Sequence, residues 1–314
     1  MTSTVGVGGA AAAATVRRQL TGGKVDVAGG VFRGLLLGAL GVSLAILGVL
    51  FFDVLTTGSV VFSDRAESFL SGGLRTSAEA AGVFQAVRGT FWIGVFVVVL
   101  SFPIGIASAV YLEEYAARGP LARIVDVNIR NLAGVPSIVY GILGLTIFVG
   151  QLEGLTGGRT VMAAGITLAI LVLPIVIITS AEAIRAVPSS LREAGYGVGA
   201  TRWEVTRTLV LPYALPGVIT GTVLALARAI GEAAPLLLCG AVTGLLPGRD
   251  GLLDTAQLQD RFTALPIVIA DWARTPREGF DELAAAAIIV MLGIVLAMNT
   301  IAIVLRSRYE KRRN

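Results

Sequence analysis

Long apolar runs dominate the chain, and polar connections separate them. Six runs are long enough to cross the roughly 30 Å apolar layer of a bilayer as helices. The pattern therefore predicts an all-α, polytopic membrane protein with six transmembrane helices. The predicted spans cover residues 33–55, 88–111, 131–151, 160–180, 213–242 and 283–305.

Lys and Arg residues are distributed unequally between the two sides that these spans define. One side, which includes both chain ends and the loop at 181–212, carries 16 of them, and the other side carries eight. Because cytoplasmic loops are enriched in Lys and Arg, we expect both termini and this loop to be cytoplasmic. The protein is thus expected in a bacterial or archaeal cytoplasmic membrane.

The spans and loops together predict the organisation of the chain. Residues 1–30, rich in Gly, Ala and Thr, are expected to be a disordered cytoplasmic tail. A first transmembrane helix, a periplasmic segment, a transmembrane core and a basic cytoplasmic tail follow. Their expected ranges are 31–56, 57–87, 88–305 and 306–314, and the core includes the cytoplasmic loop 181–212 and the periplasmic loop 243–282.

The loop at 243–282 contains one apolar stretch, Phe262 to Trp272, that is too short to span a bilayer. We interpret it as an interfacial or re-entrant helix, or else as part of a folded loop with its own small core.

The composition limits the catalytic and metal-binding functions that the chain can have. Hydrophobic residues make up 55% of the chain and charged residues 15%, against about 25% charged in soluble domains. The chain has no His, which removes His-based acid–base catalysis, Ser-His-Asp triads and most zinc sites. The single Cys239 lies in an apolar run and is expected in the core. We expect no cofactor and no metal.

The loop at 181–212 is the most informative polar segment. Ser190-Leu-Arg-Glu193 and Thr201-Arg-Trp-Glu204 both fit the capping box, in which a hydroxyl and a Glu satisfy free N–H groups at a helix start. Gly197 and Gly199 lie between them, where the first helix must end. The loop is therefore predicted to be a helix–turn–helix, presented outside the bilayer to a partner.

Two charged residues lie inside the predicted span 213–242. Arg228 is near its middle, and Glu232 follows at i+4 on the same helix face. An Arg at the bilayer centre costs about 2.5–3.5 kcal/mol, so it should face the bundle interior or a water-filled path. Two interpretations stay open: a structural ion pair that joins helices, or a polar gate for an anion, since the guanidinium fork suits an oxyanion.

The loop resembles the EAA loop of ABC-importer permeases, E-A-A-x(3)-G-x(9)-I-x-L-P. Glu193, Ala194, Gly199 and Leu211-Pro212 match it, and the departures are mild: position 195 is Gly where the family commonly has Ala, and position 211 is Leu. Three further segments are similar to phosphate permeases of the Pst system: Leu132–Gly141, Tyr111–Tyr115 and Arg228–Leu236. Two features favour the PstA type: Glu232-Ala-Ala-Pro235 within the last of these segments, and Ala264-Leu-Pro-Ile-Val-Ile269 with Trp272.

The resemblance covers roughly residues 76–310. It implies the fold of a type I ABC-importer permease, which is MetI-like, and a role in ATP-driven import of inorganic phosphate. It also implies a PstC-type second permease, a PstB-type ATPase dimer that receives the EAA loop, and a PstS-type phosphate-binding protein that is periplasmic or lipid-anchored. Lipid surrounds such a protein, and no nucleic acid partner is expected.

The chain itself lacks the phosphate-loop pattern G-x(4)-G-K-[ST]. We therefore expect it to be no enzyme and ATP hydrolysis to occur in a partner. Alternatives are a permease for another oxyanion, such as sulfate or molybdate, and a scaffold that signals phosphate status. A membrane-embedded enzyme is disfavoured by the absence of His and of a clustered intramembrane carboxylate pair.

Overall fold

The computed structural model describes residues 27–116, 119–244, 246, 251–253 and 258–311. Within these ranges the chain forms α-helices and three π-helical turns but no strand, which confirms the all-α prediction. Five helices are long and apolar enough to span a membrane, or six if one bent pair forms a single span. Of the two predicted tails, residues 1–26 and 312–314 lie outside the described residues.

Because the described part of the chain has no sheet, the order of the helices along the chain gives the topology. They are α2 (Val27–Ser71), α3 (Phe84–Val110), η1 (Tyr111–Tyr115), α4 (Pro120–Ala133), α5 (Ser137–Gly144), η2 (Leu145–Gln151), α6 (Glu153–Thr156), α7 (Val161–Arg185), α8 (Ser189–Gly197), α9 (Arg202–Val205), η3 (Thr206–Val210), α10 (Leu211–Gly231), α11 (Ala234–Leu238), α12 (Leu265–Trp272) and α13 (Phe280–Lys311).

Helix α2 belongs to two compact units, residues 1–53 and residues 54–314. In the first unit, the described residues are apolar and exposed almost throughout, and a helix that is hydrophobic all round needs an apolar environment. The helix then runs beyond residue 56, where the first span was expected to end. Val61 and Phe69 account for this extension, because both are buried in a core of the second unit.

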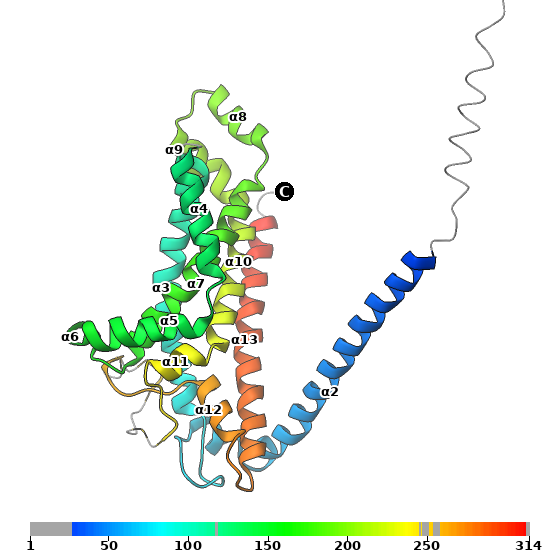
Figure 1. Ribbon diagram of the computed structural model, residues 1–314, viewed down its shortest axis with the longest axis vertical. Coiled ribbons are helices and arrows are strands. Elements are labelled where there is room, and N and C mark those ends of the chain that lie inside the picture. Colours follow the sequence, from blue (N-terminus) through cyan, green and yellow to red (C-terminus); the bar gives the residue numbers. More distant parts are fainter. Residues whose placement is uncertain (1–26, 117–118, 245, 247–250, 254–257, 312–314) are drawn as a thin grey trace, which may run out of the picture. The chain divides into compact units, whose positions relative to one another are not determined.

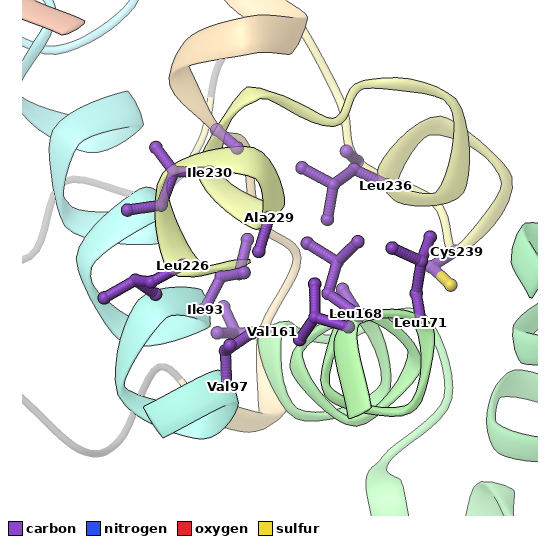
Figure 2. Packing of buried hydrophobic residues seen from close by; sticks show 14 of the residues in the cluster. Ile93, Val97, Val161, Leu168, Leu171, Leu226, Ala229, Ile230, Leu236 and Cys239 are labelled. Carbon is purple, nitrogen blue, oxygen red and sulfur yellow. The ribbon is translucent and has the colours of Figure 1, made fainter. Parts of the chain in front are cut away.

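Helix α7 lies at the centre of the second unit. Two thirds of its most apolar window is buried, more than in any other described span, and α3 and α10 both pack along it. Figure 1 shows these helices and α13 running lengthwise, with α8 at one end and α12 at the other. The largest buried cluster fills the space between them. Figure 2 shows its side chains converging from α3, α7, α10 and α11, among them Ile93, Leu168, Ala229 and Leu236.

Small residues allow these helices to approach closely. A Cβ added to Gly221 on α10 would lie 2.5 Å from Cβ of Thr179 on α7, and one added to Gly165 on α7 would lie 2.6 Å from Cβ of Phe96 on α3. Such contacts are how membrane helices gain packing energy without a hydrophobic drive between them.

The predicted span 131–151 is bent rather than straight. Helix α4 meets the segment Ser137–Gln151 at 95°, and α5 accordingly crosses the bundle axis in Figure 1. Pro136 causes the break because it has no N–H to donate and restricts the residue before it. The carbonyl of Leu132, freed at the break, accepts bonds from Val135 N at 3.1 Å and Tyr140 Oη at 2.9 Å.

The predicted span 213–242 is also broken, so its expected continuous helix is wrong. Helix α10 ends at Gly231, Glu232 is extended at φ −79° and ψ 120°, and α11 then begins with Pro235 in its first turn. Helix α11 packs on α5. Gly141 on α5 lies against Pro235, which is buried in the first turn of α11, so α5 covers the chain just after this break. Non-helical backbone at membrane depth is tolerated where protein covers it.

The apolar stretch in the loop 243–282 forms part of a folded core. Helix α12 buries Leu265, Val268 and Trp272 together with Phe280 and the distant Phe69, and Leu265 N donates to Thr90 Oγ1 at 2.9 Å. The stretch is thus a short helix, and its core is shared with α2, α3 and α13 rather than being the loop's own.

We predict that Gly141→Ala separates the two interrupted helices. A Cβ at this position would lie 2.8 Å from Cα of Pro235 and 2.7 Å from Cδ1 of Leu238, and overpacking of this kind costs about 1–3 kcal/mol. The thermal midpoint of the solubilised protein should fall by several degrees. Gly154→Ala is the matched control, since no atom lies within 4 Å of its added Cβ. Equal midpoints for the two variants would contradict the close packing of α5 on α11.

Candidate functional site

The segment between α7 and α10 contains two short helices, α8 and α9, with a turn between them. Helix α8 ends at Gly197, and Gly199 adopts the left-handed conformation at φ 83°. Ala200 N donates to Gly195 O at 3.1 Å, and Gly199 N donates to Tyr196 O at 3.0 Å. These two bonds form a Schellman motif, which fixes the end of α8. Gly199, rather than Gly197, is the residue that reverses the chain.

The second capping box is confirmed and the first is wrong. Glu204 N donates to Thr201 Oγ1 at 3.3 Å, and Thr201 N donates to the Glu204 carboxylate at 2.7 Å. In contrast, α8 begins two residues earlier than expected. Its N-cap is Pro188, without any side-chain cap, because the restricted backbone of Pro188 already leads into the helix and its carbonyl accepts Leu191 N at 3.2 Å. Ser190 and Glu193 therefore do not form the expected reciprocal pair.

One side of the loop packs on the bundle. Gly195 is buried, and a Cβ there would lie 2.7 Å from Val205 Cγ2 and 2.9 Å from Leu209 Cδ1. This contact explains why Gly occupies a position where the related motif commonly has Ala. Ile184 and Val187 continue the same apolar cluster toward α7.

The other side of the loop is open. Glu193 and Ala194 are exposed, and so are three large side chains: Tyr196 at 44%, Val198 at 86% and Trp203 at 55%. Exposed aromatic and aliphatic side chains at the end of a rigid loop are typical of a protein-binding surface. Here we call Glu193, Ala194, Tyr196, Val198 and Trp203 the exposed face of the loop.

Leu211 and Pro212 do not end the loop with a turn. The helical segment runs from Arg202 to Gly231 through η3, and Pro212 occupies the first turn of α10 directly after this π-helical turn. The wider π-helical turn accommodates a residue without an N–H inside a continuous helix. The loop is therefore joined to α10 as one rod.

The structure brings Arg228 and Glu232 together, but not in mid-span. Arg228 lies in the last turn of α10, and Glu232 is the C-cap residue at the break before α11. The expectation of a mid-helix position is wrong because the helix ends at Gly231. Arg228 Nε lies 3.5 Å from Glu232 Oε1, and the two side chains are 54% and 19% exposed. The pair is thus loose and partly open to solvent.

Two further ion pairs were not found from the sequence. Glu113 pairs with Arg185, and Glu114 pairs with Arg192, which joins η1 to α7 and α8. The acidic pair in Tyr111–Tyr115 was visible in the sequence, but no local spacing relates it to arginines more than 70 positions away. Among the described residues no group of three or more His, Cys, Asp or Glu could hold a metal ion.

Comparison with known proteins places the chain in a family. The model of the family "Binding-protein-dependent transport system inner membrane component" matches residues 101–313. "Phosphate transport system permease protein PstA 1" of Mycobacterium tuberculosis is 32% identical over 235 residues, which are 74% of this chain and 73% of that protein. "Phosphate transport system permease protein PstA" of Mycobacterium leprae is 34% identical over 228 residues, 71% of each chain.

The fold agrees with this assignment. A solved chain of the MetNI methionine ABC transporter in an inward-facing conformation aligns with a TM-score of 0.55 at 18% identity, over 73% of this chain and 94% of that one. This likeness confirms the MetI-like fold of an ABC-importer permease. The chain therefore belongs to the inner membrane components of binding-protein-dependent transport systems, as a multi-pass permease of the PstA type.

Proposed function

We propose that this chain is one membrane permease of an ATP-driven importer of inorganic phosphate and that it forms half of the translocation path. The main observation in support is the half-exposed Arg228 at the break between α10 and α11. In addition, relatives that are similar to this chain are named phosphate transport permeases. A second, PstC-type permease would supply the other half, and a PstS-type protein would deliver phosphate from the opposite side.

The chemistry of Arg228 suits phosphate. Its planar guanidinium offers several donors in a fixed fork, which matches two oxygens of a tetrahedral anion. Glu232, 3.5 Å away, holds the guanidinium when no anion is present and weakens a bound anion by repulsion. A transport path needs both properties, because an ion must enter the path and also leave it.

Energy enters through the loop. The chain has no phosphate-loop motif, so a PstB-type ATPase dimer would hydrolyse ATP and contact the exposed face of the loop. The Schellman motif at Gly199 and the capping box at Thr201 fix both ends of the turn. A turn fixed in this way is displaced as a unit when it is pushed. The Lys and Arg distribution supports a cytoplasmic location for the loop and both termini.

Arg228 variants test the substrate and the path together. In cells lacking the native permease, the wild-type chain should restore labelled-phosphate uptake. Arg228→Ala should lower it about ten- to a hundredfold, since a hydrogen bond to a charged group contributes about 1.5–3 kcal/mol. Arg228→Lys should rescue only in part because Lys lacks the bidentate fork. Arg306, exposed at the far end of α13, provides the control variant Arg306→Ala, which should transport normally.

Two outcomes would contradict this proposal in different ways. Normal uptake by Arg228→Ala would remove the guanidinium from the path. Restored uptake of sulfate or molybdate in place of phosphate would keep the permease but assign another oxyanion.

Gly199 variants test the loop. Because Gly199 has φ 83°, a β-branched residue there should cost about 1–2 kcal/mol, so Gly199→Val should loosen the turn and reduce co-purification of the ATPase. Gly197→Val is the matched control. Both positions have open space around an added Cβ, but only Gly199 has positive φ. Identical ATPase recovery with the two variants would show that the turn geometry does not matter for docking.

A further inference from the structure

The end of α3 carries a carboxylate that is almost completely buried. The Glu114 side chain is 4% exposed and lies in the π-helical turn η1. Its Oε1 accepts bonds from Arg192 Nε at 3.1 Å and Arg192 Nη2 at 2.7 Å. A buried carboxylate is expensive to desolvate unless it is paired and hydrogen-bonded. Glu114 therefore depends on the position of Arg192, which lies on α8.

Arg192 is also bonded to a third element. Its Nη1 donates to Val187 O at 2.7 Å, and its Nη2 donates to Ile184 O at 2.9 Å. These carbonyls lie in the last turn of α7 and in its link to α8, where the negative end of the helix dipole favours a cation. One guanidinium thus joins α3, through η1, to α7 and to α8.

The π-helical turn allows the two neighbouring acids to contact different helices. Ala116 N donates to Tyr111 O at 2.8 Å, the wide i to i+5 bond of such a turn. Glu113 faces Arg185 at the end of α7, and Glu114 faces Arg192 on α8. The first pair is more open to solvent, with the Arg185 side chain 56% exposed, against 22% for Arg192. Only the second of these two pairs reaches α8.

We propose that the Glu114–Arg192 pair is a positioning pair that fixes α8 to the ends of α3 and α7, so that displacement of α8 moves both helices. If the pair were lost, the direct link between α8 and α7 would be the covalent one through residues 186–188. That link would bend, and α7 would not follow the displacement of α8. This inference rests on the proposed function, because it assumes that an ATPase pushes on the loop. It concerns coupling efficiency and not phosphate recognition.

A purely structural role predicts a different result. If the pair only stabilised the fold, its loss would lower the amount of assembled complex, and the surviving complexes would work normally. If the pair transmits motion, assembled complexes would still hydrolyse ATP but import less phosphate per ATP. The ratio of ATP hydrolysed to phosphate imported separates the two because it does not depend on the amount of complex.

The test uses the complete purified complex, with its ATPase and binding protein, reconstituted in proteoliposomes. Glu114→Gln keeps the shape and removes the charge. We expect it to raise the ATP-to-phosphate ratio by about fivefold or more, the lower end of the usual range for coupling between sites. Arg192→Lys keeps the charge but cannot reach both carbonyls and the carboxylate, so it should raise the ratio as well. Glu113→Gln is the matched control and should leave the ratio unchanged.

A double variant, Glu114→Gln with Arg192→Gln, should be no worse than either single change, because the two residues act as a unit. A wild-type ratio in both Glu114→Gln and Arg192→Lys would overturn the inference, and so would an equal increase in Glu113→Gln. Failure of the wild-type complex to import phosphate would instead refute the proposed substrate. The same ratio, measured with the oxyanion that the complex does import, would still test the pair.

Discussion

A backbone N–H or carbonyl inside a bilayer must find its partner within the protein, and the fold of this chain depends on that constraint. Two spans are interrupted, at Pro136 and between Glu232 and Pro235. The second break is followed by the packing of α11 on α5, and at the first break Tyr140 donates to the freed Leu132 carbonyl. Helices α3, α7 and α10 supply the packed surroundings in which such irregular backbone is tolerated.

The residues that we propose to contact the anion lie at one of these breaks. An uninterrupted helix hides its backbone and presents only side chains, whereas here α10 ends beside the Arg228–Glu232 pair, whose i,i+4 spacing brings the two side chains together. The proposed anion path therefore follows from the same interruption that the packing of α5 on α11 stabilises. The glycines that allow close contact are part of this arrangement, since a side chain at Gly141 would collide with the backbone of Pro235.

Much of this could be predicted from the sequence, because membrane spans and glycine turns leave strong local signals. The apolar runs located the spanning helices, and the two glycines at 197 and 199 located the end of α8. The start of α8 was misplaced since the Ser190 pattern competes with Pro188 for the N-cap, and local spacing does not decide between them. The end of α10 was missed because Gly231 and Pro235 are tolerated inside membrane helices as well as at breaks.

Contacts between distant segments could not be predicted at all. The pair of Glu114 and Arg192 joins residues 78 positions apart, and neither residue shows by its local pattern that it will be buried. These contacts connect α8 to the bundle. In the proposed coupling, ATPase movement enters at the exposed face of the loop and reaches α3 and α7 through the Arg192 guanidinium. The continuous segment of α9, η3 and α10 joins the loop to the break that holds Arg228.

Site-directed cross-linking tests the central claim, docking of the loop on an ATPase, most directly. In a Cys239→Ser background, Val198→Cys places a thiol on the most exposed apolar residue of the loop, and Gly154→Cys places one on α6. A short cross-linker applied to the assembled complex should join the chain to its ATPase through residue 198 and not through residue 154. An assembled, active complex that gives no ATPase adduct through residue 198 would contradict the account.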